Sequence, residues 1–311
     1  MSLISVVLPV MNESLNIKPI YDVIRKVIAD TGNSYQILFV CDPSSDGTEQ
    51  EIELLSRNDT QVEGIFLAER AGQSEAIRAG YEHANGEAVI TMDADFQDPP
   101  EVIEEMINAW KSGSLIVHSK RGDRTSDSLI YRLFTGVGYR GLAWLTNGKV
   151  RNNVGDFRLI DKTIIPLVLK YKDPNPFWRG ITSLSGISST VLLYKRPSRR
   201  AGQTKYSLRI GSPSIALRGM ASFSNKPLEL LQSIGFFSVL ISTFVIVGIF
   251  LVQVLVPTFP RGTPTIIALL AFFFAIQFVS TAIIATYLIV LIEQTRRRPN
   301  YILKPKKNQK D

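Results

Sequence analysis

The sequence predicts an α/β protein in which a mostly parallel, helix-covered sheet is followed by an interfacial helix and two transmembrane helices. Short apolar runs alternate with amphipathic stretches through the first half of the chain, which is the pattern of repeated βα units. Two later stretches carry no charged residue, and each exceeds the roughly 20 residues that a membrane-spanning helix needs. Basic residues flank these stretches, while the preceding part is mildly acidic.

The βα pattern gives the expected elements of the sheet domain. Apolar runs predict strands at 3–8, 36–41, 64–67 and 88–92. Amphipathic periodicity predicts helices at 15–29, 47–55, 73–84 and 100–110. Farther along, we expect a helix at 128–145 and strands at 154–160 and 187–194. Ligands of parallel sheets bind beyond the carboxyl ends of the strands, so those ends are where a site is expected.

The uncharged runs, 234–256 and 266–292, predict a transmembrane hairpin with a Pro- and Gly-rich turn between them. The basic stretch before them, with spaced apolar residues, predicts an interfacial amphipathic helix, although a solvated linker helix would share its composition. We therefore expect four regions: a catalytic domain at 1–205, an interfacial segment at 206–227, the hairpin at 228–292 and a basic tail at 293–311.

The placement of charge predicts which side of the membrane the domain occupies. The chain has 35 basic and 28 acidic residues, and the excess lies at 194–226 and 296–311, beside the apolar runs. Positive flanks are typical of the cytoplasmic side, which puts the catalytic domain and both termini in the cytoplasm of a multi-pass protein of the cell membrane. A nucleic-acid-binding protein would carry the basic face on its folded domain, so that class is excluded. The single cysteine, Cys41, agrees with a cytoplasmic location.

Three polar clusters follow three of the predicted strands. They are Asn12-Glu13, the stretch from Asp42 to Asp46, and Asp93-Ala94-Asp95. Because parallel strands place their carboxyl ends side by side, the three clusters should converge on one rim. Each cluster alone is better explained as turn and helix-capping residues, since Asp, Asn and Ser favour both positions, but the three together favour a site.

The third cluster has the donor pattern of a divalent-cation site. Carboxylates at Asp93 and Asp95, with Gln97 close behind, offer the oxygen ligands that Mg²⁺ or Mn²⁺ prefers, and leave positions for diphosphate oxygens and water. Such an ion would neutralise the charge that develops on a departing nucleotide diphosphate.

The stretch DADFQDPPE, from Asp93 to Glu101, resembles the metal-binding signature of family 2 glycosyltransferases of the GT-A fold, and most closely their polyprenyl-phosphate sugar transferases. LPVMNE and CDPSSDGT resemble the nucleotide-binding strand ends of that family. The resemblance implies a Rossmann-like GT-A domain, a nucleotide-sugar donor and a polyprenyl phosphate acceptor. The nucleotide-sugar residues that it implies are Pro9, Asn12, Glu13, Asp42, Asp46, Asp93, Ala94 and Asp95; the metal residues are Asp93, Asp95 and Gln97.

Two later stretches complete the resemblance. NVGDFRLIDK resembles the segment that carries an acidic residue near the reacting centre, which falls on Asp156. RRAGQTKYS resembles a basic loop that contacts phosphates. We expect the phosphates to be aligned by four basic residues: Arg199, Lys205, Arg121 and Arg124. A phosphate monoester is already anionic at neutral pH, because its second pKa is about 6, so Asp156 is expected to orient the reactants rather than act as an obligate base. The resemblance also implies inversion at the anomeric carbon.

The sequence departs from the family pattern at 67–72, which reads LAERAG, and near the end of the second apolar run. Several alternatives stay open. UDP-glucose is the preferred donor, but UDP-N-acetylglucosamine and GDP-mannose would use the same metal site. A processive polysaccharide synthase usually carries a Gln-x-x-Arg-Trp motif, which this chain lacks. A catalytically silent membrane scaffold is the non-enzymatic alternative, and a homo-oligomer is possible. Trp178 fits either a sugar contact or a packing anchor.

Overall fold

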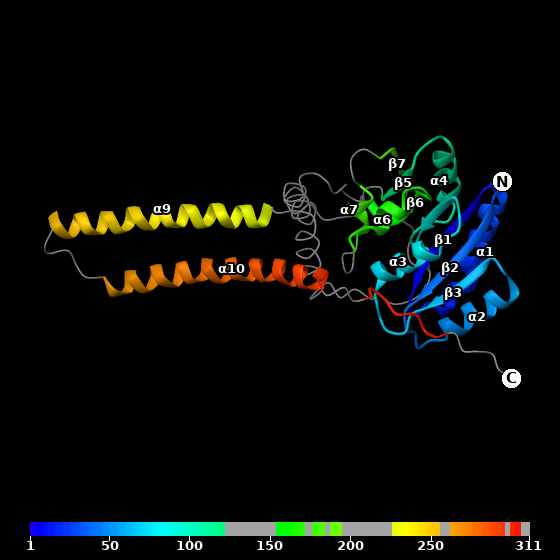
Figure 1. Cartoon of the computed structure of the whole chain (residues 1–311), viewed down its shortest axis with the longest axis horizontal. Helices are drawn as coiled ribbons and strands as arrows, with labels where there is room; N and C mark the ends of the chain where they lie inside the picture. Colours follow the sequence, from blue (N-terminus) through cyan, green and yellow to red (C-terminus); the bar gives the residue numbers. More distant parts are fainter. Residues whose placement is uncertain are drawn as a thin grey trace. The chain divides into compact units, whose positions relative to one another are not determined.

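A computed structural model describes residues 1–121, 154–171, 176–183, 187–194, 226–255, 262–295 and 299–305 (Figure 1). The described residues fall into two compact units. One unit holds all the described strands together with residues 299–305, and the other holds two long helices.

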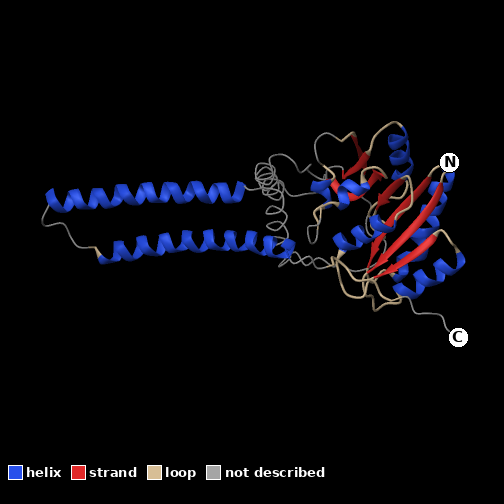
Figure 2. Cartoon of the chain, viewed as in Figure 1, coloured by secondary structure: helices blue, strands red, loops and turns tan. Residues whose placement is uncertain are grey.

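The first unit is built on a seven-stranded sheet in the order β3-β2-β1-β4-β6-β5-β7. Its strands are red in Figure 2. The strands are β1 (Leu3–Val10), β2 (Ser34–Cys41), β3 (Val62–Phe66), β4 (Ala88–Thr91), β5 (Ile116–Arg121), β6 (Val154–Asp161) and β7 (Ser189–Tyr194). β1 pairs in parallel with β2 and β4, β2 with β3, and β5 with β7. β6 runs antiparallel to both of its neighbours. The expected mostly parallel sheet is confirmed, with β6 as its one antiparallel strand among those described.

Helices cover both faces of this sheet. They are α1 (Ser14–Asp30), α2 (Thr48–Asn58), α3 (Gln73–His83), α4 (Val102–Lys111), α6 (Ile165–Leu169) and α7 (Trp178–Ile181). α1 contacts α2, α4 and β2 on one side, whereas α3 contacts β1, β2 and α6. The first four helices and the strands before them agree with the sequence prediction to within a few residues at each end.

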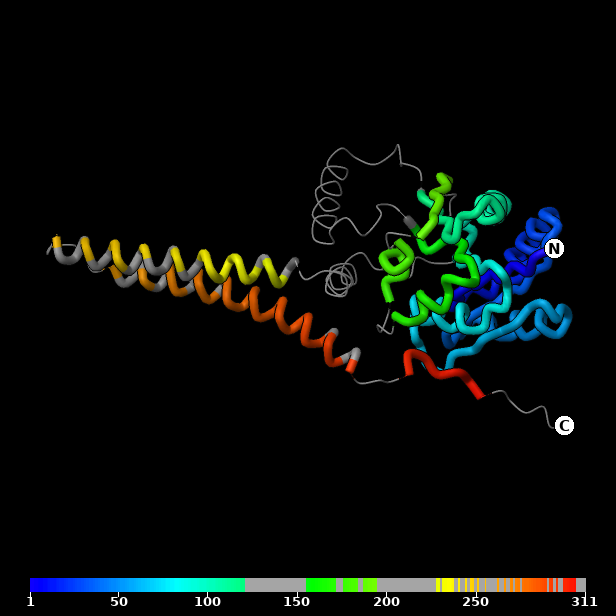
Figure 3. Tube along the Cα trace, turned by 45° about the horizontal axis from the view of Figure 1, so that its top comes forward, coloured from blue at the N-terminus to red at the C-terminus, as the bar shows by residue number. Residues whose placement is uncertain are grey.

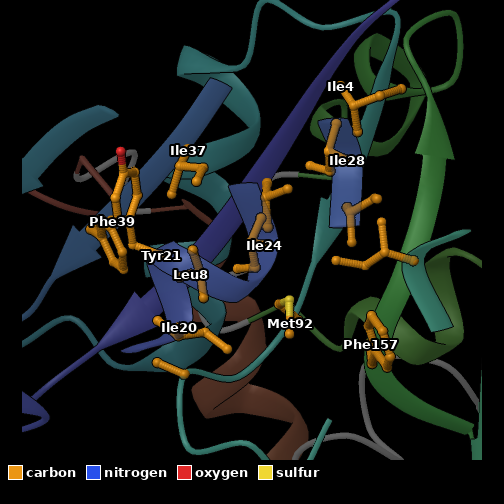
Figure 4. Close-up of a cluster of buried hydrophobic side chains, with 14 of the residues drawn as sticks. Ile4, Leu8, Ile20, Tyr21, Ile24, Ile28, Ile37, Phe39, Met92 and Phe157 are labelled. Carbon is orange, nitrogen blue, oxygen red and sulfur yellow. The ribbon is translucent and has the colours of Figure 1, made fainter. Parts of the chain in front are cut away.

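The alternation of β1 explains how the two faces are held. Ile4 and Leu8 point to the α1 face, where they join Ile20 and Ile24 in the main apolar cluster (Figure 4). The four isoleucines of α1 lie three or four residues apart, which places them on one side of the helix. The register of β1, which positions the loop that follows it, is therefore fixed by a fully buried core.

The opposite face of β1 is closed by a glycine contact. A Cβ atom added at Gly80 of α3 would lie 2.1 Å from Cγ1 of Val7. Any side chain at position 80 would push α3 away from β1. Gly80 thus lets α3 pack directly on the strand, with its N-terminus at the edge where the polar clusters lie.

Three elements were not predicted: β5, α6 and α7. The predicted helix at 128–145 lies outside the described residues, as does nearly all of the interfacial segment at 206–227.

The second unit consists of α9 (Lys226–Leu255) and α10 (Thr263–Thr295), which contact each other (Figures 1 and 3). Both helices lie where the uncharged runs predicted them. Within α10, the stretch Phe272–Ile289 is long and apolar enough to cross a membrane. Among the described residues it is the one helix that meets this test, so the span predicted within α9 stays a prediction.

Candidate active site

The loops after β1, β2 and β4 leave the sheet at the same edge. Val10 pairs with Cys41, and Val7 pairs with Thr91, so the three strands end close to one another. The three polar clusters follow directly on these ends. Hydrogen bonds between the loops described below bring these clusters onto one rim.

Asn12 and Glu13 join the first loop to the second. Asn12 has a left-handed backbone with φ of 51°; its N–H donates to Ser44 Oγ at 3.0 Å, and its Oδ1 accepts from the Ser45 N–H at 2.8 Å. The buried Glu13 is held in a similar way, because its N–H donates to Thr48 Oγ1 at 2.8 Å. These contacts fix the distance between the ends of β1 and β2.

Asp42 positions a third loop. Its carboxylate is buried, and its two oxygens accept from the backbone N–H groups of Ala71 and Gly72, each at 3.0 Å. The loop at 67–72 is thereby tied to the end of β2 immediately before α3 begins. This is the loop whose sequence departs from the family pattern. Its conformation depends on the hydrogen bonds to Asp42 as well as on its own residues.

Asp46 accepts hydrogen bonds from the first residues of two helices. Its Oδ2 accepts from the Ser14 N–H at 3.0 Å, at the start of α1, and its Oδ1 accepts from the Thr48 N–H at 3.1 Å, at the start of α2. Partial desolvation of the carboxyl raises its pKa, but the hydrogen bonds from Thr48 and Ser14 outweigh that effect and lower the pKa of Asp46 to about 2. Asp46 therefore supports the starts of two helices although their N-cap residues are Glu13 and Gly47.

Asp46→Ala should lower the stability of the domain by about 1 kcal/mol at neutral pH, because two helix starts lose a hydrogen-bond acceptor. A depressed pKa stabilises the folded state above the unfolded value, here 3.8, and this contribution is lost as the pH falls toward about 2. Thermal unfolding of the wild type and the variant from pH 7 to pH 2 should show a gap in Tm that closes below pH 3.8. A gap of constant size would contradict this role.

Asp93 and Asp95 follow β4 in a tightly held turn. Asp93 Oδ1 accepts from Gln73 Nε2 at 2.9 Å, which links it to the first residue of α3. Asp95 is buried, and its Oδ1 accepts from the Gln97 N–H at 3.0 Å. Phe96, between Asp95 and Gln97, has a left-handed backbone with φ of 62°. The turn is thus constrained both by its backbone and by hydrogen bonds to its carboxylates.

A further carboxylate, that of Asp98, anchors this turn from below. Asp98 is buried; its Oδ2 accepts from the Asp93 N–H at 3.2 Å, and its Oδ1 accepts from the Tyr194 hydroxyl at 2.9 Å. The bond to Tyr194 ties the turn to β7 across the sheet. Asp98 was not among the residues predicted from the sequence, although its position within DADFQDPPE was a signal.

The donor set of the turn fits a hard divalent cation. The described residues contain no group of three or more His, Cys, Asp or Glu side chains arranged to hold a metal ion. The turn itself offers the carboxylates of Asp93 and Asp95. Mg²⁺ is commonly bound in this way, by one or two carboxylates together with phosphate oxygens of the substrate and water.

Asp156 lies on β6 and is held by two arginines. Its Oδ1 accepts from Arg158 Nη2 at 2.6 Å, and its Oδ2 accepts from Arg179 Nη2 at 2.9 Å. The Arg158 side chain is fully buried, and it also donates to Thr182 Oγ1 at 2.6 Å. The Arg179 side chain is 40% exposed. The carboxylate therefore orients one buried guanidinium and one that reaches solvent.

The antiparallel pairing of β4 and β6 brings Asp156 to the rim. Thr91 pairs with Arg158. Asp93 follows Thr91 by two residues and Asp156 precedes Arg158 by two, so antiparallel pairing puts both near the same end of the two strands. The turn at 93–98 and Asp156 therefore lie at the same end of the β4–β6 pair.

Trp178 is a packing anchor. It is 2% exposed, its Nε1 donates to the Ser74 carbonyl at 2.8 Å, and its ring meets Tyr81 edge-on at 5.4 Å. These contacts fix α7 against α3. Arg179, the next residue, is consequently aimed at Asp156, and neither Arg158 nor Arg179 was singled out from the sequence.

The other predicted residues are placed as follows. Pro9 lies near the end of β1, and Ala94 is buried between the two aspartates. Arg121 is the last residue of β5. The remaining phosphate-binding candidates, Arg124, Arg199 and Lys205, lie outside the described residues.

A family model described as "Glycosyl transferase family 2" matches residues 5–166, just over half of the chain. The chain belongs to glycosyltransferase family 2. The match begins in β1 and includes both Asp93-Ala94-Asp95 and Asp156. The matched region therefore contains all of the acidic residues of the rim described above.

This glycosyltransferase is similar to other proteins over nearly its full length. It is 33% identical to the bactoprenol glucosyl transferase of Shigella phage SfV, over 98% of this chain and 99% of the relative. It is 32% identical to the prophage bactoprenol glucosyl transferase homolog of Escherichia coli K12, over 97% and 98%. Among solved structures, glucosyl-3-phosphoglycerate synthase from Mycobacterium tuberculosis, crystallised with Mn²⁺, UDP and phosphoglyceric acid, has a TM-score of 0.52 at 17% identity, over 71% and 76%. That similarity establishes the GT-A fold.

Proposed function

We propose that this glycosyltransferase moves glucose from UDP-glucose to a polyprenyl phosphate, with inversion at the anomeric carbon and with Mg²⁺ or Mn²⁺. The observation that carries the proposal is the rim on which Asp93, Asp95 and Asp156 meet the loops held by Asp42. Two relatives whose names specify glucosyl transfer and bactoprenol, and which match the chain end to end, support the choice of sugar and acceptor. A UDP-bound structure of the same fold supports the choice of nucleotide.

In this proposal Asp93 and Asp95 would hold the cation, and the donor would bind beside it. The ion supplies Lewis-acid stabilisation of the charge on the departing nucleotide. Gln73 and Asp98 keep Asp93 in place through the hydrogen bonds to its Oδ1 and its N–H. The loop at 67–72, fixed by Asp42, lies next to α3 and closes the donor side of the rim.

Asp156 orients rather than abstracts a proton. Both of its oxygens accept from guanidinium groups, and an anionic phosphate oxygen needs no base to attack. Arg179, the more exposed of the two partners, is placed to meet the acceptor phosphate. Attack from the face opposite the leaving diphosphate inverts the anomeric centre.

Membrane attachment completes the proposal. The acceptor is a lipid, and α10 contains a stretch that could cross the bilayer. The basic flanks favour placing the rim in the cytoplasm, which is the compartment where nucleotide-sugars are made. The span within α9 and the interfacial segment at 206–227 belong to this proposal as well.

The test is direct transfer. Membranes that contain the full chain are incubated with undecaprenyl phosphate and radiolabelled UDP-glucose, UDP-N-acetylglucosamine or GDP-mannose, with Mg²⁺ or with EDTA. We expect label in the lipid phase from UDP-glucose only, and only with the metal. Label from another donor would show that the transferred sugar is not glucose. Absence of lipid-linked product from every donor would favour the membrane scaffold instead.

A further inference from the structure

Residues 299–305, which follow α10, pack against the sheet unit (red in Figures 1 and 3). The Ala68 N–H donates to the Ile302 carbonyl at 2.8 Å, and the Lys304 N–H donates to the Phe66 carbonyl at 2.8 Å. Between them, Leu303 forms an antiparallel bridge with Leu67. The segment thus forms a single β-bridge at the point where β3 ends and the loop at 67–72 begins.

Side chains fasten the same segment to two helices. Lys304 Nζ contacts both carboxylate oxygens of Glu49 at 2.8 Å, in the first turn of α2. The Tyr301 hydroxyl donates to Glu82 near the end of α3. Residues 299–305 therefore touch three elements that otherwise depend on the sheet for their relative position.

These contacts reach the donor side of the rim through the loop at 67–72. One end of the loop is tied to Ile302 through Ala68, and its other end is tied to the carboxylate of Asp42 through Ala71 and Gly72. The residue that follows the loop, Gln73, holds Asp93. Loss of the first tie would leave the start of the loop held only at Leu67, whose N–H donates to the Cys41 carbonyl at 2.9 Å.

We propose that residues 299–305 are a positioning strap for nucleotide-sugar binding: they hold the loop at 67–72 in the conformation that receives the donor. The strap touches neither the proposed metal residues nor Asp156, so it should affect donor binding and leave the chemical step unchanged. This inference rests on the proposed function, because it assumes that the rim binds a nucleotide-sugar.

The experiment uses charge exchange in the full-length chain. Lys304→Glu places two carboxylates together at the α2 contact, Glu49→Lys places two ammonium groups there, and the double variant restores an ion pair in the opposite sense. Lys26→Glu, at an exposed position of α1, is the matched control for the change in net charge. UDP-glucose affinity is measured by calorimetry with Mg²⁺, and donor KM, acceptor KM and kcat are measured by lipid transfer.

We expect each single variant to raise the donor Kd and the donor KM by about fivefold, the scale of 1 kcal/mol at a partly exposed pair. The acceptor KM and kcat should stay near wild type, the double variant should regain most of the loss, and Lys26→Glu should match wild type. Unchanged donor constants, or a double variant as weak as the singles, would overturn the strap. A wild type that binds UDP-glucose but transfers nothing would refute the proposed function alone; one that binds no nucleotide would refute both.

Discussion

Asp95→Asn is expected to reduce glucosyl transfer by about 10³-fold, the equivalent of about 4 kcal/mol of transition-state stabilisation. The substitution removes one negative charge from a site that offers two carboxylates. It retains the Oδ1 atom, which accepts from the Gln97 N–H at 3.0 Å. The turn should therefore keep its conformation while its affinity for the cation falls. Asp93→Asn should act similarly, because its Oδ1 can still accept from Gln73.

The measurement pairs transfer rates with nucleotide affinity. In the wild type, Mg²⁺ should tighten UDP binding relative to EDTA, and in Asp95→Asn that difference should disappear. Glu101→Gln, an exposed carboxylate change just before α4, is the control for a lost charge near the turn and should behave as wild type. Retention of more than about a tenth of the wild-type rate by Asp95→Asn would contradict a metal role for this residue.

The sequence predicted the first four strands and helices because their apolar periodicity is uninterrupted. It did not reveal β5, since two of the six residues, His118 and Ser119, are polar and yet fully buried. Ser119 donates to the Phe157 carbonyl within the sheet. Helices of five and four residues, such as α6 and α7, are too short to show a helical period. The direction of β6 depends on pairing with β4 and β5, which local composition does not encode.

The part of the candidate site that directly follows predicted strands could be predicted from the sequence, and the rest could not. Residues that follow strands directly, such as Asp93 and Asp95, could be placed on one rim from the order of the strands alone. The partners of Asp156 could not, because Arg179 lies 23 residues away on a short helix. A signal was present in the arginine of the apolar run FRLI, since a buried guanidinium requires an anionic partner.

The contact between the basic tail and the sheet unit could not be predicted from the composition of the tail. The described part of the tail, 299–305, pairs with residues of the sheet unit, a contact that its basic composition did not predict. Lys304 and Glu49 are 255 residues apart, so no sequence window contains both. Charge counts give the side of the membrane that a segment prefers, whereas its partner depends on the folded surface.

Asp156→Asn should reduce kcat/KM by about 10²-fold without changing the shape of the pH profile. One charged hydrogen bond of about 2.7 kcal/mol corresponds to that loss. Both wild type and variant should lose rate below about pH 6, where the acceptor phosphate takes up a proton. Between pH 6.5 and 9, a range chosen to exclude that limb, the ratio of their rates should stay constant, as measured by lipid transfer.

The companion variant Arg179→Gln separates orientation from base catalysis. If Asp156 acts by holding Arg179, both single variants break the same unit, and the double variant should be about as slow as either one. If Asp156 acted as a base independently of Arg179, the two losses would multiply to about 10⁴-fold. Because an anionic acceptor already carries its nucleophilic oxygen, the first outcome is expected, and the second would require the acceptor to react as its protonated form.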